Sequence, residues 1–170
     1  PGFGIVQGLA PIVGFNYGAK NYERIREVII YAAKIISVYL VGGFIFVQLF
    51  ATSIFTIFSK NNDLLFIEYG ANAFRIVSYG FLLVTFQFLV SSIYQSLGYP
   101  KRALFVAISR QTLIFVPLVF LITHFYGLQG IWYTYAASDL LAGLLGLFML
   151  IYELRVFKKI IANEKATSLM

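Results

Sequence analysis

The chain has 170 residues, of which 60% are apolar and only 12% charged, and its mean hydropathy is +0.84. Soluble domains carry about 25% charged residues, so this composition excludes an ordinary water-soluble globule. With no cysteine and a single histidine, the chain also excludes disulfides, thiolate metal sites and a multi-histidine metal site. We therefore expect an integral membrane protein that contacts lipid and holds neither a metal nor another cofactor.

Five apolar stretches follow one another, at about residues 1–17, 28–58, 65–97, 103–123 and 131–152. A transmembrane helix needs about 20 apolar residues, whereas barrel strands are about 10 residues long and alternate in polarity. The stretches therefore predict an all-α fold, a polytopic transmembrane helix bundle over residues 1–152. The first stretch is short and has no initiator methionine, so we expect it to be the remainder of a longer helix, with more spans before it.

Basic residues alternate between the breaks that separate these stretches. They follow the first and third stretches and fill the tail 153–170: Lys20, Arg24, Arg26, Lys101, Arg102, Arg155, Lys158, Lys159 and Lys165, with Arg110 just inside the fourth stretch. The two opposite breaks hold only Lys60 and His124. Because cytoplasmic loops are enriched in Lys and Arg, this pattern predicts a cytoplasmic C-terminus and a cytoplasmic basic tail. It also explains the net charge of +6 without nucleic acid as a partner.

Ionisable residues inside the stretches are candidates for function, because hydrocarbon penalises them. Asp139 lies within the fifth stretch and could bind a cation or proton, or anchor a helix through a hydrogen bond. We expect Arg75 to snorkel outward and Arg110 to snorkel or to pair across helices, both as structural or interfacial charges. The neutral side chains of Gln7, Gln87 and Gln95 could bridge helices or contact substrate.

Small residues and prolines predict how the helices pack. Residues that let backbones approach recur at a spacing of four: Gly4 and Gly8, Gly14 and Gly18, Ala103 and Ala107, and Ala142 and Gly146. Pro11 and Pro117 each lack a backbone donor and should kink their helices, either as fixed bends or as bends that move during transport. The sequence has no GxSxG, HExxH or P-loop lysine motif, so an enzyme is not expected.

The first stretch carries the most specific pattern, G-x-x-Q-G-x-x-P-x-x-G-x-N-Y-G-A from Gly4 to Ala19, followed by a basic loop. It resembles the eighth helix of the multidrug and toxic compound extrusion (MATE) family, bacterial multidrug branch. Later segments resemble the tenth to twelfth helices in the same order: residues 94–98, 109–117, 127–132 and 138–139. The resemblance covers the whole chain apart from the tail.

The resemblance implies five helices, the eighth to the twelfth, of a twelve-helix transporter with two lobes in the bacterial plasma membrane. It implies export of small organic cations by antiport with sodium or protons, through alternating access, together with the N-terminal lobe of the same protein. The residues expected along the substrate or cation pathway are Gln7, Pro11, Asn16, Tyr17, Gln87, Gln95 and Asp139. Family members that couple through the tenth helix use an acidic residue there, whereas the interior charge of the third stretch is Arg75, so coupling is not assigned to that helix.

Two alternatives remain open at this point. A lipid-linked oligosaccharide flippase of the same superfamily would have a larger basic cavity, with which Arg75 and Arg110 are compatible. A non-transporting membrane scaffold subunit would lack a sealed cavity and would tolerate changes at Asp139 and Gln7.

Overall fold

The computed structural model describes residues 2–60 and 63–167, and in these ranges every regular element is helical. The order is α1 (Gly2–Gly18), α2 (Tyr22–Phe58), α3 (Leu64–Ser96), α4 (Pro100–Ile108), a π-helical segment (Ser109–Phe115), α5 (Val116–Tyr126), a 3₁₀ turn (Gly127–Gln129) and α6 (Gly130–Thr167). The predicted all-α fold is confirmed, and the fourth apolar stretch is α4 and α5 joined by the π-helical segment. Asn61 and Asn62, part of a predicted break, lie outside the described residues.

Local chemistry explains where the helices begin and end. The side chain of Asn21 accepts a hydrogen bond from the Arg24 amide at 3.1 Å and caps α2. Asp63 caps α3 in the same way, accepting from the Leu65 amide at 3.0 Å. Gly127 ends α5 with a φ of 58°, a conformation that glycine adopts without steric cost.

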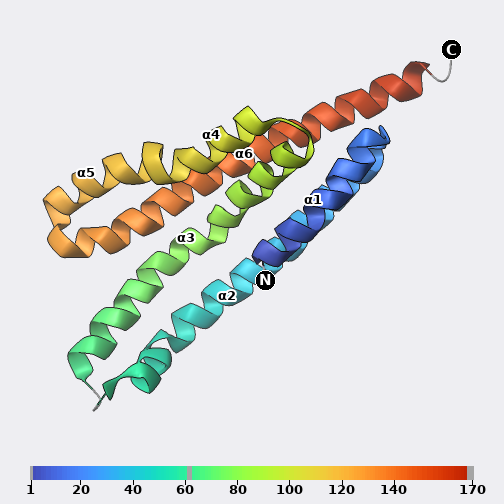
Figure 1. Ribbon diagram of the computed structural model, residues 1–170. Helices are drawn as coiled ribbons and strands as arrows, with labels where there is room; N and C mark the ends of the chain where they lie inside the picture. The colour runs from blue at the N-terminus through green and yellow to red at the C-terminus, as the bar shows by residue number, and fades with distance from the viewer. Residues whose placement is uncertain (1, 61–62, 168–170) are drawn as a thin grey trace.

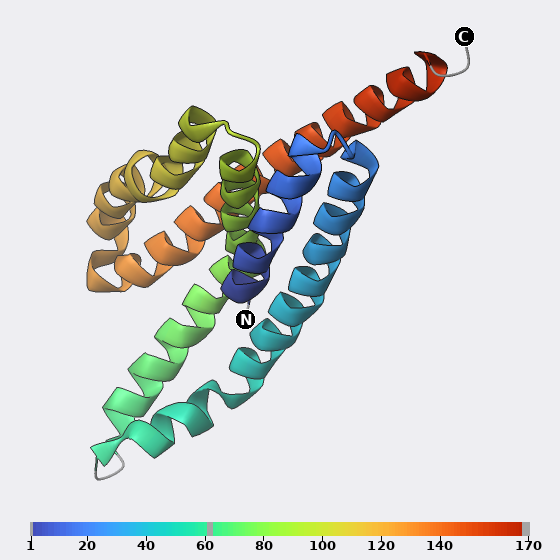
Figure 2. The same cartoon turned by 45° about the vertical axis from the view of Figure 1, so that its right-hand side comes forward.

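The helices form two arms that diverge from a shared end (Figure 1). One arm contains α2 and α3, with α1 beside α2, and the other is a hairpin of α4–α5 and α6 (Figure 2). The shared end, here called the basic end, carries the α1–α2 turn, the α3–α4 turn and the C-terminal part of α6. The structure therefore confirms that the three basic segments of the sequence gather at one end of the bundle.

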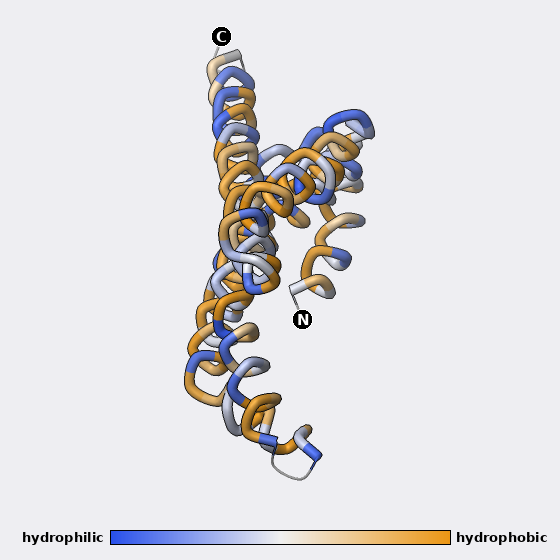
Figure 3. The backbone as a smooth tube through the Cα atoms, turned by 90° about the vertical axis from the view of Figure 1, so that its left-hand side faces the viewer, coloured by the Kyte–Doolittle hydropathy of each residue, from blue (hydrophilic) through white to orange (hydrophobic). Residues whose placement is uncertain are grey.

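Apolar side chains cover the long helices on the outside as well as between them. Among the residues that the structure describes, three helical stretches are long and apolar enough to cross a membrane: Tyr22–Phe58, Leu64–Ser96 and the folded-back stretch Pro100–Ala166. Hydrophobic colour runs along most of the tube, and hydrophilic residues gather at the turns and along the end of α6 (Figure 3). The predicted tail does not begin a separate element, because α6 continues through residue 152 to Thr167.

Glycines set the closest approach between α3 and α6. A Cβ atom on Gly143 would lie 2.4 Å from the backbone of Leu83, and one on Gly146 would lie 2.6 Å from the Cα of Gln87. Gly146 is one of the predicted packing residues, and Gly143 is not. Within the described part of the chain, no neighbouring atom lies within 4 Å of a Cβ built on three of the predicted packing glycines: Gly4, Gly8 and Gly18.

The two prolines inside predicted helices have different surroundings. Helix α1 runs unbroken through Pro11, which is exposed. Pro117 lies in the first turn of α5, directly after the π-helical segment. Because proline cannot donate to the carbonyl four residues earlier, Pro117 explains why the regular α-helical ladder is interrupted on its N-terminal side.

Candidate functional site

A buried carboxylate lies where α6 crosses α3. Asp139 is only 3% exposed, although its helix belongs to an apolar span. It fits there because Gly80 on α3 has no side chain: a Cβ built on Gly80 would lie 2.6 Å from the Cβ of Asp139. A buried carboxylate in such a position needs a counter-charge or a proton.

Arg110 supplies that counter-charge from the π-helical segment. Its Nε donates to Oδ1 of Asp139 at 2.7 Å, and its guanidinium carbon lies 5.6 Å from the centre of the Phe88 ring. The side chains of Arg110 and Asp139 are 27% and 5% exposed respectively, so the carboxylate is the more deeply buried partner. Of the two alternatives that the sequence left for Arg110, the pairing across helices is confirmed.

The π-helical segment Ser109–Phe115 places Arg110 against α6. A π turn holds more residues than an α turn, so it rotates the side chains that follow relative to a regular helix. Such segments are rare, occur mostly as short insertions and are frequently found at functional sites. The local geometry and the ion pair therefore belong to the same feature of the fold.

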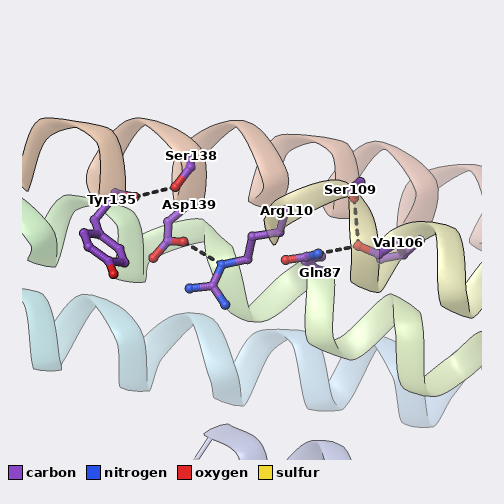
Figure 4. A network of polar contacts seen from close by, with 7 residues as sticks. All are labelled: Gln87, Val106, Ser109, Arg110, Tyr135, Ser138 and Asp139. Atoms are coloured by element: carbon purple, nitrogen blue, oxygen red, sulfur yellow. Dashed lines mark hydrogen bonds and ion pairs between the residues drawn. The ribbon is translucent and has the colours of Figure 1, made fainter. Parts of the chain in front are cut away.

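Gln87 completes the polar cluster from α3 (Figure 4). It is buried, and its Nε2 donates to the carbonyl of Val106. The hydroxyl of Ser109 donates to the same carbonyl at 2.7 Å. The Oε1 of Gln87 is buried without a hydrogen-bond partner, and Figure 4 shows it on the side that faces Arg110. The cluster thus holds an unused acceptor beside an ion pair.

The other predicted site residues do not join this cluster. Gln7 and Pro11 are exposed on α1, away from its buried face. Gln95 is exposed near the end of α3, where its Nε2 lies 3.5 Å from the Ser91 hydroxyl. Arg75 is bound to α2: its Nη2 donates to the Thr52 hydroxyl at 3.0 Å. The structure therefore brings together only Gln87 and Asp139 of the predicted pathway residues, with Arg110.

A second polar cluster forms at the basic end. Asn16 donates to the Ile12 carbonyl within α1, and the hydroxyls of Tyr17 and Tyr99 lie 3.3 Å apart. Arg102 pairs with Glu153 on α6 at 3.1 Å. The tyrosine contact and the ion pair join the end of α1, the α3–α4 turn and α6, whereas the bond of Asn16 stays within α1. Asn16 and Tyr17 thus lie at the basic end, away from the Asp139 cluster.

Glu153, which falls in the predicted tail, was not predicted as a functional residue. Its side chain is 5% exposed, while that of Arg102 is 54% exposed. A signal was present: Glu153 falls between Leu150 and Phe157, at the spacing of three and four residues that defines one helix face. Both neighbours are buried in the main apolar cluster, so Glu153 lies on the packed face of α6.

The space between the arms forms a cavity of about 510 Å³ on the side opposite to the basic end. Helices α2, α3 and α6 line it, with charged side chains of Glu68 and Arg75 and aromatic rings of Tyr79 and Trp132. The lining thus combines aromatic rings with one carboxylate and one guanidinium.

Comparison with known proteins gives the family. The family model described as MatE matches residues 1–121. The chain belongs to the MatE family. Among curated MatE relatives, "Multidrug export protein MepA" of Staphylococcus haemolyticus is 24% identical over 160 residues, 89% of this chain and 32% of the relative. The protein of the same name from Staphylococcus aureus strain MSSA476 is 28% identical over 153 residues, 89% of this chain and 33% of the relative. The chain thus spans about a third of the length of these relatives.

Solved structures of MatE proteins share the fold. The structure of the "MATE multidrug transporter DinF-BH" matches with a TM-score of 0.82 and 34% identity, covering 92% of this chain and 35% of that one. Inward-facing and outward-facing conformations of a "multidrug resistance MATE family transporter" each match with a TM-score of 0.80 at 22% identity, covering 91% of this chain. The relatives are named as transporters and not as enzymes.

Proposed function

We propose that the chain is part of a secondary active exporter that moves cationic drugs out of the cell in exchange for sodium ions or protons. The observation that carries this proposal is the buried Arg110–Asp139 pair at a π-helical segment inside a membrane span. Ionisable groups at such depth mark ion or proton pathways in transporters. The names of the MatE relatives support a drug as the substrate.

In this proposal Asp139 is the group whose partner changes during the transport cycle. In the structure only Oδ1 is paired, and among the described residues Oδ2 has no hydrogen-bond partner. A proton, or a cation that also contacts the free Oε1 of Gln87, would compete with Arg110 for the carboxylate. Such a competition couples ion binding to the position of the π-helical segment, because Arg110 moves with that segment.

Alternating access is the proposed mechanism. This part of the protein matches the inward-facing and the outward-facing relative with the same TM-score, which supports a lobe that moves as one body. Two lobes that rock about a central site require lobes of this kind. The proposal places the basic end in the cytoplasm, because its Lys and Arg residues fit the positive-inside rule.

The test uses the full-length gene in cells that lack their own drug pumps. Ethidium efflux is followed while the sodium gradient and the proton gradient are collapsed separately. Efflux that stops when one gradient is collapsed supports the proposal and identifies the coupling ion. Absence of efflux of any cationic dye, with the protein present in the membrane, would refute drug export and would favour the lipid-linked oligosaccharide flippase.

A further inference from the structure

A charged groove lies at the basic end between the start of α2 and the end of α6. Its volume is about 410 Å³, and its charged lining residues are Glu23, Arg26, Glu27, Lys158 and Lys165. It is separate from the Asp139 cluster, and neither the drug pathway nor the ion pair uses its residues.

The charges of the groove do not cancel. Glu23 pairs with Lys165 at 2.6 Å, and Glu27 pairs with Arg24 at 2.7 Å, so both carboxylates are already engaged. Arg26 and Lys158 have no acidic partner among the described residues. The Nε of Arg26 is also buried without a hydrogen-bond acceptor. An unpaired buried guanidinium N–H is costly, and an anion that reaches it would remove that cost.

The groove lies at the depth of lipid headgroups. Arg26 is two residues before the apolar stretch that begins at Val28, and Lys158 is six residues after the stretch that ends at Tyr152. At a rise of 1.5 Å per residue these positions are about 3 Å and about 9 Å beyond the hydrocarbon edge, within or next to the polar layer of the bilayer. Arginine and lysine side chains at this depth bind phosphate groups through charge-assisted hydrogen bonds.

We propose that this groove binds the phosphate headgroup of an anionic phospholipid, with Arg26 and Lys158 as the residues that contact it. The lipid would join the N-terminal turn of α2 to the C-terminal part of α6. This inference requires the membrane location of the chain and is independent of the transported substrate.

The experiment measures binding of fluorescent phosphatidylglycerol to the full-length transporter in detergent micelles, by anisotropy. The variant R26Q/K158Q removes the two unpaired charges of the groove. The control R155Q/K159Q removes two exposed charges of the same α6 segment that do not line it. Each basic residue near an anionic lipid contributes about a fivefold change in affinity, so we expect the groove variant to bind about thirtyfold more weakly. We expect the control to change affinity less than about threefold, because its charges lie outside the groove.

Two results would overturn the proposal. Equal weakening in both variants would mean diffuse attraction to the basic end. Competition by inorganic phosphate as effective as that by unlabelled phosphatidylglycerol would mean a site for free phosphate. If R26Q/K158Q does not fold, the single change K158Q at an exposed position replaces it, with an expected loss of about fivefold. Unchanged affinity in K158Q would also overturn the proposal.

Discussion

The unequal burial of Arg110 and Asp139 predicts unequal effects when either one is replaced. R110Q leaves a carboxylate whose side chain is only 5% exposed without a counter-charge. Removing one member of a buried ion pair in this way lowers the free energy of unfolding by about 3–5 kcal/mol. D139N leaves an arginine that is 27% exposed and still lies over the Phe88 ring. We expect that variant to lower the free energy of unfolding by only about 1–2 kcal/mol, because the ring and the amide oxygen that replaces the carboxylate still stabilise the remaining cation.

The double variant R110Q/D139N removes both charges and leaves two amides that can bond to each other. We expect it to be more stable than R110Q alone, with a coupling free energy of about 2–3 kcal/mol. The free energy of unfolding of the full-length transporter would be measured by SDS titration in mixed micelles for the four proteins. The result that would refute this reasoning is D139N as damaging as R110Q, or a double variant whose cost equals the sum of the single costs.

Further variants test the helix packing, Gln87 and the second polar cluster. G143A should destabilise the α3–α6 contact by about 1–3 kcal/mol in the same assay, since its Cβ would lie 2.4 Å from the α3 backbone. The matched change G42A should leave stability unchanged or raise it, because no atom lies within 4 Å of its added Cβ. A larger loss of stability in G42A than in G143A would refute the close packing at Gly143. Q87L should change the free energy of unfolding by less than about 1 kcal/mol, because it removes one hydrogen bond together with a buried unpaired oxygen. The same variant should slow efflux, and normal efflux would exclude a role for that oxygen in transport. R102Q should lower the thermal unfolding temperature more than E153Q, because only R102Q leaves a buried carboxylate; equal shifts would contradict this.

Apolar length and charge alternation predict most of the fold because both are properties of the sequence itself. The five predicted apolar stretches correspond to α1, α2, α3, α4 with α5, and the first part of α6. The alternation of basic residues between the breaks likewise predicts that the three basic segments lie at one end of the bundle. The extension of α6 to Thr167 was not predicted, because its polar surface hides the buried face that carries Glu153 and Phe157.

Pairing between helices could not be predicted from local pattern. Asp139 and Arg110 are 29 positions apart, and the sequence gives no register between their helices. The register depends on the π-helical segment and on the close approach at Gly80 and Gly143, which are properties of three helices together. The spacing of four that predicted close packing at Gly4 and Gly8 fails there because no helix in the described part of the chain covers that face of α1.

We propose that this chain belongs to a gradient-driven drug exporter in which Asp139 exchanges partners. The most direct measurement is ethidium movement in proteoliposomes containing the full-length protein, with a sodium or proton gradient imposed across the bilayer. We expect the gradient of one of these ions to drive ethidium movement in the wild-type protein. In D139N we expect the protein to stay folded and this coupling to be lost. Gradient-driven movement that is undiminished in D139N, or no movement in the wild-type protein under either gradient, would contradict the proposal.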